Sequence, residues 1–168
     1  YKRQIETKSS EIIYSHKYGV NVAIEDSTGS LWFTQSTENQ NEERLFKALD
    51  KAVPDGALYR IPISKDGTLS KPELILKNLY FANGFYIDEK RNKLYLSEMM
   101  KNRVLSFDLD ILTGSVSNQT TLAVIPTPDN MELNSEGKLW VASPLSNQIY
   151  SVDPVSYTHL RAHETLRY

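Results

Sequence analysis

Four side chains could take part in chemistry together, because each stands where a loop leads into a short apolar strand: Asn21, Asn83, Asp129 and Asn130. Their amide and carboxylate oxygens are the hard ligands that Ca²⁺ and Mg²⁺ prefer, whereas Cu²⁺ favours other donors. The chain has no cysteine and no histidine beside these four residues, so Zn²⁺ is less favoured, although carboxylate and carbonyl oxygens can hold it. Asparagine also bonds to nearby backbone at turns. The alternative to a cation site is therefore a set of ordinary turn residues.

A threefold repeat supplies strands that could bring these side chains together. Each copy reads as a short strand, a turn rich in Asp, Asn or Gly, and a strand that begins Leu-Trp or Leu-Tyr; the copies are residues 21–34, 83–97 and 129–143. Period-two alternation predicts further strands, at 57–63, 73–76, 103–109, 121–125 and 148–152. Four antiparallel strands in about 45 to 60 residues are typical of a β-propeller blade.

The sequence therefore predicts an all-β fold, a partial β-propeller of about three four-stranded blades. The predicted units are 1–18, the remnant of a preceding blade; 19–78, a blade with an inserted loop at 35–56; 79–126, a second blade; and 127–154, an incomplete third blade. Apolar positions in the inserted loop suit a short helix at 42–49, and the loop could form a lid over a pocket or a surface decoration. Residues 11–14 would be the outer strand of the preceding blade.

The repeat also predicts where the polar side chains meet. Equivalent positions in successive blades lie at the same height around the propeller axis, so Asn21, Asn83 and Asn130, with Asp129 beside it, are expected to converge on the central channel.

Other recurring residues are expected to be structural. The aromatic residues of the second strands should pack one blade against the next; they are Trp32, Tyr95 and Trp140. Glu98 ends a second strand and is expected to be a solvated or hydrogen-bonded carboxylate.

The last segment, residues 155–168, does not fit the repeat. It lacks the turn and the strand alternation expected there, and it resembles the translation of a sequencing adapter. We expect it to be a non-native tail. His159 and His163, spaced i and i+4, are therefore not assigned as metal ligands.

Composition excludes several classes of function. The formal net charge is −2, with 40% hydrophobic and 24% charged residues, which is normal for a soluble globular chain. No basic field indicates a nucleic acid or an anionic membrane as partner, and no apolar stretch indicates a membrane span. The compartment, cytoplasmic or exported, and the oligomeric state stay open.

Several short motifs resemble one known family. Residues 81–84 (Phe-Ala-Asn-Gly), 93–98, 128–130 (Pro-Asp-Asn) and 137–142 resemble the six-bladed propellers of the regucalcin/gluconolactonase superfamily. This superfamily includes paraoxonase-like arylesterases and strictosidine synthase-like proteins, and residues 79–84 with the insertion after Thr34 are closest to the strictosidine synthase-like branch. The likeness covers residues 19–154, which makes the chain about three blades of an expected six.

The resemblance implies a site and a reaction. Asn83, Asp129 and Asn130 match cation ligands of the hydrolytic members, Asp129 matches their proposed general base, and Asn21 matches a ligand or a substrate contact. The implied cofactor is a divalent cation, Ca²⁺ first, with Zn²⁺ or Mg²⁺ as alternatives. The implied substrate is a small-molecule lactone or aryl ester, whose carbonyl the cation would polarise as a Lewis acid.

Two other readings stay open. One is a metal-independent enzyme of the strictosidine synthase-like type, and the other is a propeller that binds partners without catalysis. Three blades leave two open sheet edges, so this segment expressed alone is expected to aggregate or stay partly unfolded, and to be inactive.

Overall fold

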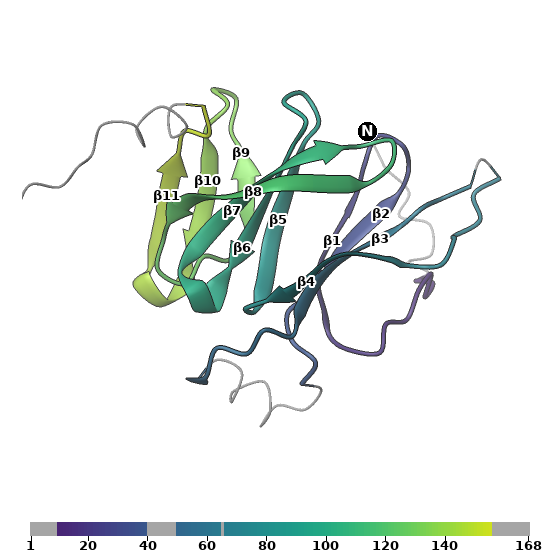
Figure 1. The fold of residues 1–168 in the computed structure, drawn as a ribbon, viewed down its shortest axis with the longest axis horizontal. Helices are drawn as coiled ribbons and strands as arrows, with labels where there is room; N and C mark the ends of the chain where they lie inside the picture. The colour runs from purple at the N-terminus through teal and green to yellow at the C-terminus, as the bar shows by residue number, and fades with distance from the viewer. Residues whose placement is uncertain (1–9, 40–49, 65, 156–168) are drawn as a thin grey trace, which may run out of the picture.

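A computed structural model describes residues 10–39, 50–64 and 66–155 of the chain. In these residues eleven strands form three antiparallel sheets, which stand side by side (Figure 1). The strands of each sheet follow one another in sequence order, so neighbouring strands in a sheet are also consecutive in the chain. The prediction of an all-β fold built from successive propeller-type blades is confirmed.

The first two sheets have four strands and the third has three. The first sheet contains β1 (Val20–Glu25), β2 (Leu31–Gln35), β3 (Gly56–Ile61) and β4 (Glu73–Leu79). The second contains β5 (Ala82–Asp88), β6 (Lys93–Glu98), β7 (Arg103–Asp110) and β8 (Ser115–Val124). The third contains β9 (Met131–Leu133), β10 (Leu139–Ser143) and β11 (Gln148–Val152). Short 3-10 turns, η1 (Met99–Lys101) and η2 (Pro144–Ser146), follow β6 and β10.

One polar residue caps the first hairpin of each sheet. In the first sheet, the Asp26 carboxylate accepts the main-chain N–H groups of Thr28 at 2.8 Å and Ser30 at 3.0 Å. Asp88 in the second sheet and Asn134 in the third occupy the corresponding turns and also accept main-chain N–H groups. A short acceptor at this place satisfies turn donors that the sheet leaves unpaired.

Aromatic residues of the second strands pack between the blades. Trp32 and Tyr95 are buried, and Trp32 Nε1 donates a hydrogen bond of 2.7 Å to Asp26. Trp140, at the corresponding place in β10, is 52% exposed, because no described segment covers that face of the third sheet. The expected packing role is therefore seen for Trp32 and Tyr95, each of which packs against residues of the following blade.

Glu98 is buried and has a structural environment. Arg103 lies 2.5 Å from its carboxylate, and the main-chain N–H of Tyr80 donates to it at 3.0 Å. Glu98 thus ties the start of β7 and the β4–β5 connection to β6, as expected for a hydrogen-bonded carboxylate.

The segment before β1 differs from its prediction. Residues 10–18 form no strand. Instead, Tyr14 and His16 lie on the first sheet, where both rings contact Phe33 and His16 also contacts Tyr59. Aromatic cover of an exposed sheet face replaces the outer strand predicted at residues 11–14. The helix predicted at 42–49 and almost all of the tail at 155–168 lie outside the described residues.

The buried Tyr95 predicts a loss of stability at alkaline pH. Burial raises the pKa of Tyr95 to about 12, and the charge of Asp88 adds to the effect. The pKa of an unfolded tyrosine lies near its ordinary value of 10.0, so this contribution to stability is complete below pH 10 and is lost as the pH rises through 12. The difference is at most about 2.7 kcal/mol.

Urea denaturation below pH 10 and near pH 12 measures this contribution. We expect the free energy of unfolding to fall less steeply in Tyr95→Phe than in the parent protein. An equal fall in both proteins would contradict the assignment to Tyr95.

Candidate metal centre

The innermost strands place the candidate residues at one height. β5 lies between β1 and β9 and contacts both (Figure 1). In the sheet registers Ala23 pairs with Phe33, Phe85 with Leu96, and Met131 with Val141; these are the same positions of successive blades.

Counting back two residues from each of these positions gives Asn21, Asn83 and Asp129. The residue equivalent to Asn83 in the third blade is therefore Asp129, whereas Asn130 is equivalent to Gly84. The prediction had aligned the asparagines by side-chain type, which shifted the third blade by one residue. The register itself is fixed by two main-chain bonds, from the Asp129 N–H to Ala142 and from the Ala142 N–H to Asn130.

Gly84 allows the second and third blades to approach closely. A Cβ atom at this position would lie 2.5 Å from Asn130 Cα and 2.6 Å from the Asp129 carbonyl oxygen. Both are main-chain atoms, so neither can move aside as a side chain would. Glycine at residue 84 is therefore the condition for Asn83 and Asp129 to lie next to each other.

The Asn83 side chain is buried with half of its amide unsatisfied. The residue is 4% exposed, and its Nδ2 contacts Met99 Sδ at 3.6 Å. Among the described residues, no donor reaches Asn83 Oδ1. A buried acceptor without a partner costs about 1–3 kcal/mol, so a bound cation or donor at this oxygen would be favourable.

Asp129 is half-buried and lies beside Asn83. Burial raises the pKa of the Asp129 carboxyl above its usual value, while hydrogen bonds from the Asn130 main-chain N–H and the Asn83 side chain oppose the shift. The carboxylate and the amide of Asn83 thus form one polar pair between the second and third blades. A carboxylate with a free amide oxygen nearby is a donor set that fits a hard divalent cation.

The other two candidates are less engaged with this pair. Asn21 is exposed, and its Nδ2 donates to Ser36 Oγ at 2.9 Å, which leaves the amide oxygen for another contact. Asn130 is exposed as well. In the described part of the chain, no three His, Asp or Glu side chains are grouped so as to hold a metal ion. A cation bound here would therefore need amide oxygens as ligands in addition to the single carboxylate of Asp129.

Sequence reasoning missed three residues that support this pair. Gly84 follows Asn83 directly, and an Asn-Gly pair in the middle of a strand was a signal for close backbone approach. Thr34 and Ser97 donate hydroxyl hydrogen bonds to the main chain of the next blade. The signal for both was a residue with a hydroxyl group at the same position of the second strand, in the first blade and again in the second blade.

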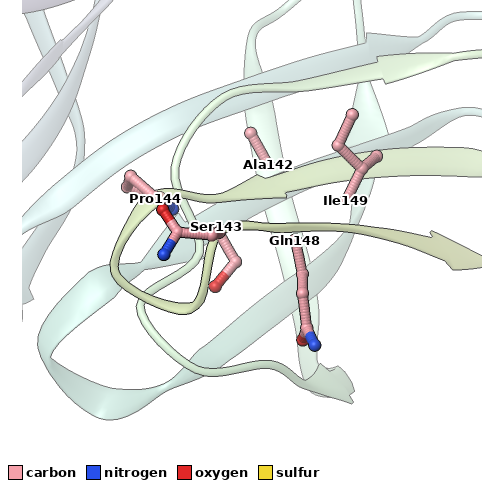
Figure 2. Close-up of a pocket in the computed structure, with 6 residues that line it drawn as sticks. Ala142, Ser143, Pro144, Gln148 and Ile149 are labelled. Atoms are coloured by element: carbon pink, nitrogen blue, oxygen red, sulfur yellow. The ribbon is translucent and has the colours of Figure 1, made fainter.

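A surface hollow lies elsewhere, on the third sheet. It has a volume of about 360 Å³ and is lined by residues of β10, η2, β11 and the η2–β11 connection, namely Ala142, Ser143, Pro144, Asn147, Gln148 and Ile149 (Figure 2). None of the candidate ligands lines this hollow. We therefore do not assign the chemistry to it.

The fold defines the class of this protein as a β-propeller, with amide and carboxylate side chains at the start of its inner strands. The model of the family described as "SMP-30/Gluconolactonase/LRE-like region" matches residues 7–162. The chain belongs to this family. The resemblance stated from the sequence motifs is confirmed.

Individual relatives span several activities. Strictosidine synthase of Catharanthus roseus is 26% identical over 146 residues, which cover 85% of this chain and 39% of the relative. Regucalcin of Danio rerio is 31% identical over 106 residues, which cover 61% of this chain and 34% of the relative. The chain thus spans less than half the length of these curated relatives.

Solved structures agree with the fold. Luciferin-regenerating enzyme matches with a TM-score of 0.64 and 26% identity, over 81% of this chain and 42% of that one. A gluconolactonase from Xanthomonas campestris matches with a TM-score of 0.56 and 20% identity, over 80% of this chain and 46% of that one. No helix in the described residues has the length and hydropathy that crossing a bilayer would take.

Proposed function

We propose that the complete protein is a divalent-cation-dependent hydrolase of small lactones or aryl esters, with Ca²⁺ as the cation. One observation carries the proposal: a buried amide oxygen, Asn83 Oδ1, lacks a donor among the described residues and belongs to a side chain that lies beside the Asp129 carboxyl. Oxygen-only ligands of this kind suit Ca²⁺, which binds carboxylate oxygens together with the carbonyl oxygens of amide groups.

The chain's own residues would hold and orient the cation. Asn83 and Asp129 would supply oxygens from adjacent blades, and the exposed side chains of Asn21 and Asn130 would add their amide oxygens. When bound, the cation would polarise the substrate carbonyl and stabilise negative charge as it develops on that oxygen. Buried Phe81 and Met99 border Asn83 and would limit the access of water to this side of the site.

Asp129 has two roles in this proposal. Its carboxylate would be the one charged ligand, and it would also accept the proton of the attacking water. A carboxylate bound to a divalent ion is a weak base, and the burial that raises the Asp129 pKa works in the opposite direction. The ligand role is the one that the pairing with Asn83 supports.

The relatives support the same reading at a coarser level. Regucalcin of Danio rerio is 31% identical where it aligns, and a fold neighbour from Agrobacterium tumefaciens is described as "a calcium-binding protein, regucalcin". The family description includes gluconolactonase, which acts on a lactone.

A cation titration combined with an activity panel tests the proposal. We expect calorimetry on the complete, chelator-treated protein to show Ca²⁺ binding, and we expect Ca²⁺ to restore hydrolysis of at least one lactone or aryl ester. Hydrolysis that persists in excess chelator would contradict the cation's role.

One observation favours a second function, a metal-independent condensing enzyme. The alignment with strictosidine synthase covers 85% of this chain, more than the regucalcin alignment does. That function predicts no Ca²⁺ binding and condensation of an amine with an aldehyde. Ca²⁺ binding without turnover of any ester or lactone would instead indicate a propeller that binds partners without catalysis.

A further inference from the structure

Two buried hydroxyl groups connect each blade to the candidate site residue of the next. Thr34 in β2 and Ser97 in β6 occupy the same place in their strands, and both are 0% exposed. Thr34 Oγ1 donates to the Asn83 carbonyl oxygen at 2.9 Å, and Ser97 Oγ donates to the Asp129 carbonyl oxygen at 2.8 Å. The first blade therefore holds the main chain of Asn83, and the second blade holds that of Asp129.

Both carbonyl groups lie where the regular strand pairing is interrupted or has not yet begun. In β5 the register shifts between Ala82 and Phe85, so Asn83 lies in a bulge where one residue is left outside the ladder. Asp129 precedes β9, and its N–H, not its carbonyl, bonds to β10. Buried main-chain carbonyls need a donor, and the two hydroxyls supply it.

Thr34 makes a second contact that reaches the first blade's own inner strand. Its Oγ1 accepts the N–H of Val22 at 3.3 Å while donating to the Asn83 carbonyl. Val22 follows Asn21 directly. One hydroxyl thus fixes the spacing between the strand positions of Asn21 and Asn83.

We propose that Thr34 and Ser97 are positioning residues of the cation site, which set the main-chain positions of Asn83 and Asp129 by bonds across the blade interfaces. They do not touch the cation. Their hydroxyls hold two neighbouring ligands at the separation that one ion requires. This inference rests on the proposed function.

The test measures cation affinity when each hydroxyl is removed. In the complete protein, Ser97→Ala and Thr34→Val are each expected to weaken Ca²⁺ binding by about fivefold to tenfold, since each loses one hydrogen bond that orders a ligand. The conservative variants Ser97→Thr and Thr34→Ser keep a hydroxyl and are expected to retain affinity within about twofold. If Ser97→Ala does not fold, Ser97→Cys provides a weaker donor and is expected to show the same loss.

A matched control separates positioning from ordinary stability. Ser106 is a buried serine of β7 that makes none of these contacts, so Ser106→Ala is expected to leave the Ca²⁺ affinity unchanged. Ca²⁺ affinity that stays at the parent value in Ser97→Ala and Thr34→Val, while their melting temperatures fall, would overturn the positioning role alone. A parent protein that binds no Ca²⁺ would overturn the proposed function and this inference with it.

Discussion

Replacing Gly84 by alanine is expected to destabilise the protein by about 3 kcal/mol or more and to abolish cation binding. The new methyl group would lie 2.5 Å from Asn130 Cα and 2.6 Å from the Asp129 carbonyl oxygen. These atoms belong to the main chain of the third blade, so that blade must move outward. The displacement separates Asp129 from Asn83, and the pair that would hold the cation is lost.

Urea denaturation and Ca²⁺ calorimetry on Gly84→Ala measure both effects. Gly19→Ala is the matched control: no atom lies within 4 Å of its added Cβ, so its stability should change by no more than about 0.5 kcal/mol. A Gly84→Ala protein as stable as this control would show that the two blades do not need their close approach.

Removing the charge of Asp129 is the second large expected effect. Asp129→Asn keeps the shape of the side chain but replaces the single carboxylate of the pair. Loss of a residue that only supports a metal ligand can cost up to about 100-fold in affinity, so loss of the charged ligand itself should weaken Ca²⁺ binding by at least about 100-fold. Turnover should fall in parallel, because the proposed ligand and the proposed proton acceptor are the same carboxylate.

An exposed carboxylate nearby provides the control for charge alone. Glu132 lies on β9, three residues from Asp129, and faces solvent. Glu132→Gln is expected to bind Ca²⁺ like the parent protein. If Asp129→Asn binds Ca²⁺ as tightly as Glu132→Gln does, Asp129 is not a ligand.

The sequence predicted the blades well because their signals are local. Alternating apolar residues and the turn residues around Asp26, Asp88 and Asn134 define each hairpin from neighbours in the chain. The inner strands and the aromatic packing of Trp32 and Tyr95 followed from those signals, whereas the family was indicated by the resemblance of several short motifs.

The geometry between blades was harder to predict. The one-residue shift that aligns Asp129 with Asn83 is set by main-chain bonds to Ala142, and side-chain type gives no information about such bonds. The close approach at Gly84 brings this residue against Asp129 and Asn130, which lie 45 and 46 positions later in the sequence. The absence of a strand at residues 10–18 likewise follows from packing on Phe33 and Tyr59, which no local pattern shows.

In the proposed site, adjacent blades present Asn83 and Asp129 to one cation. A crystal structure of the complete protein grown with Ca²⁺ tests this arrangement most directly. We predict an ion with Asn83 Oδ1 and an Asp129 carboxylate oxygen both at about 2.3–2.6 Å. An ion bound elsewhere, with Asn83 Oδ1 accepting a hydrogen bond from a protein donor, would contradict the arrangement.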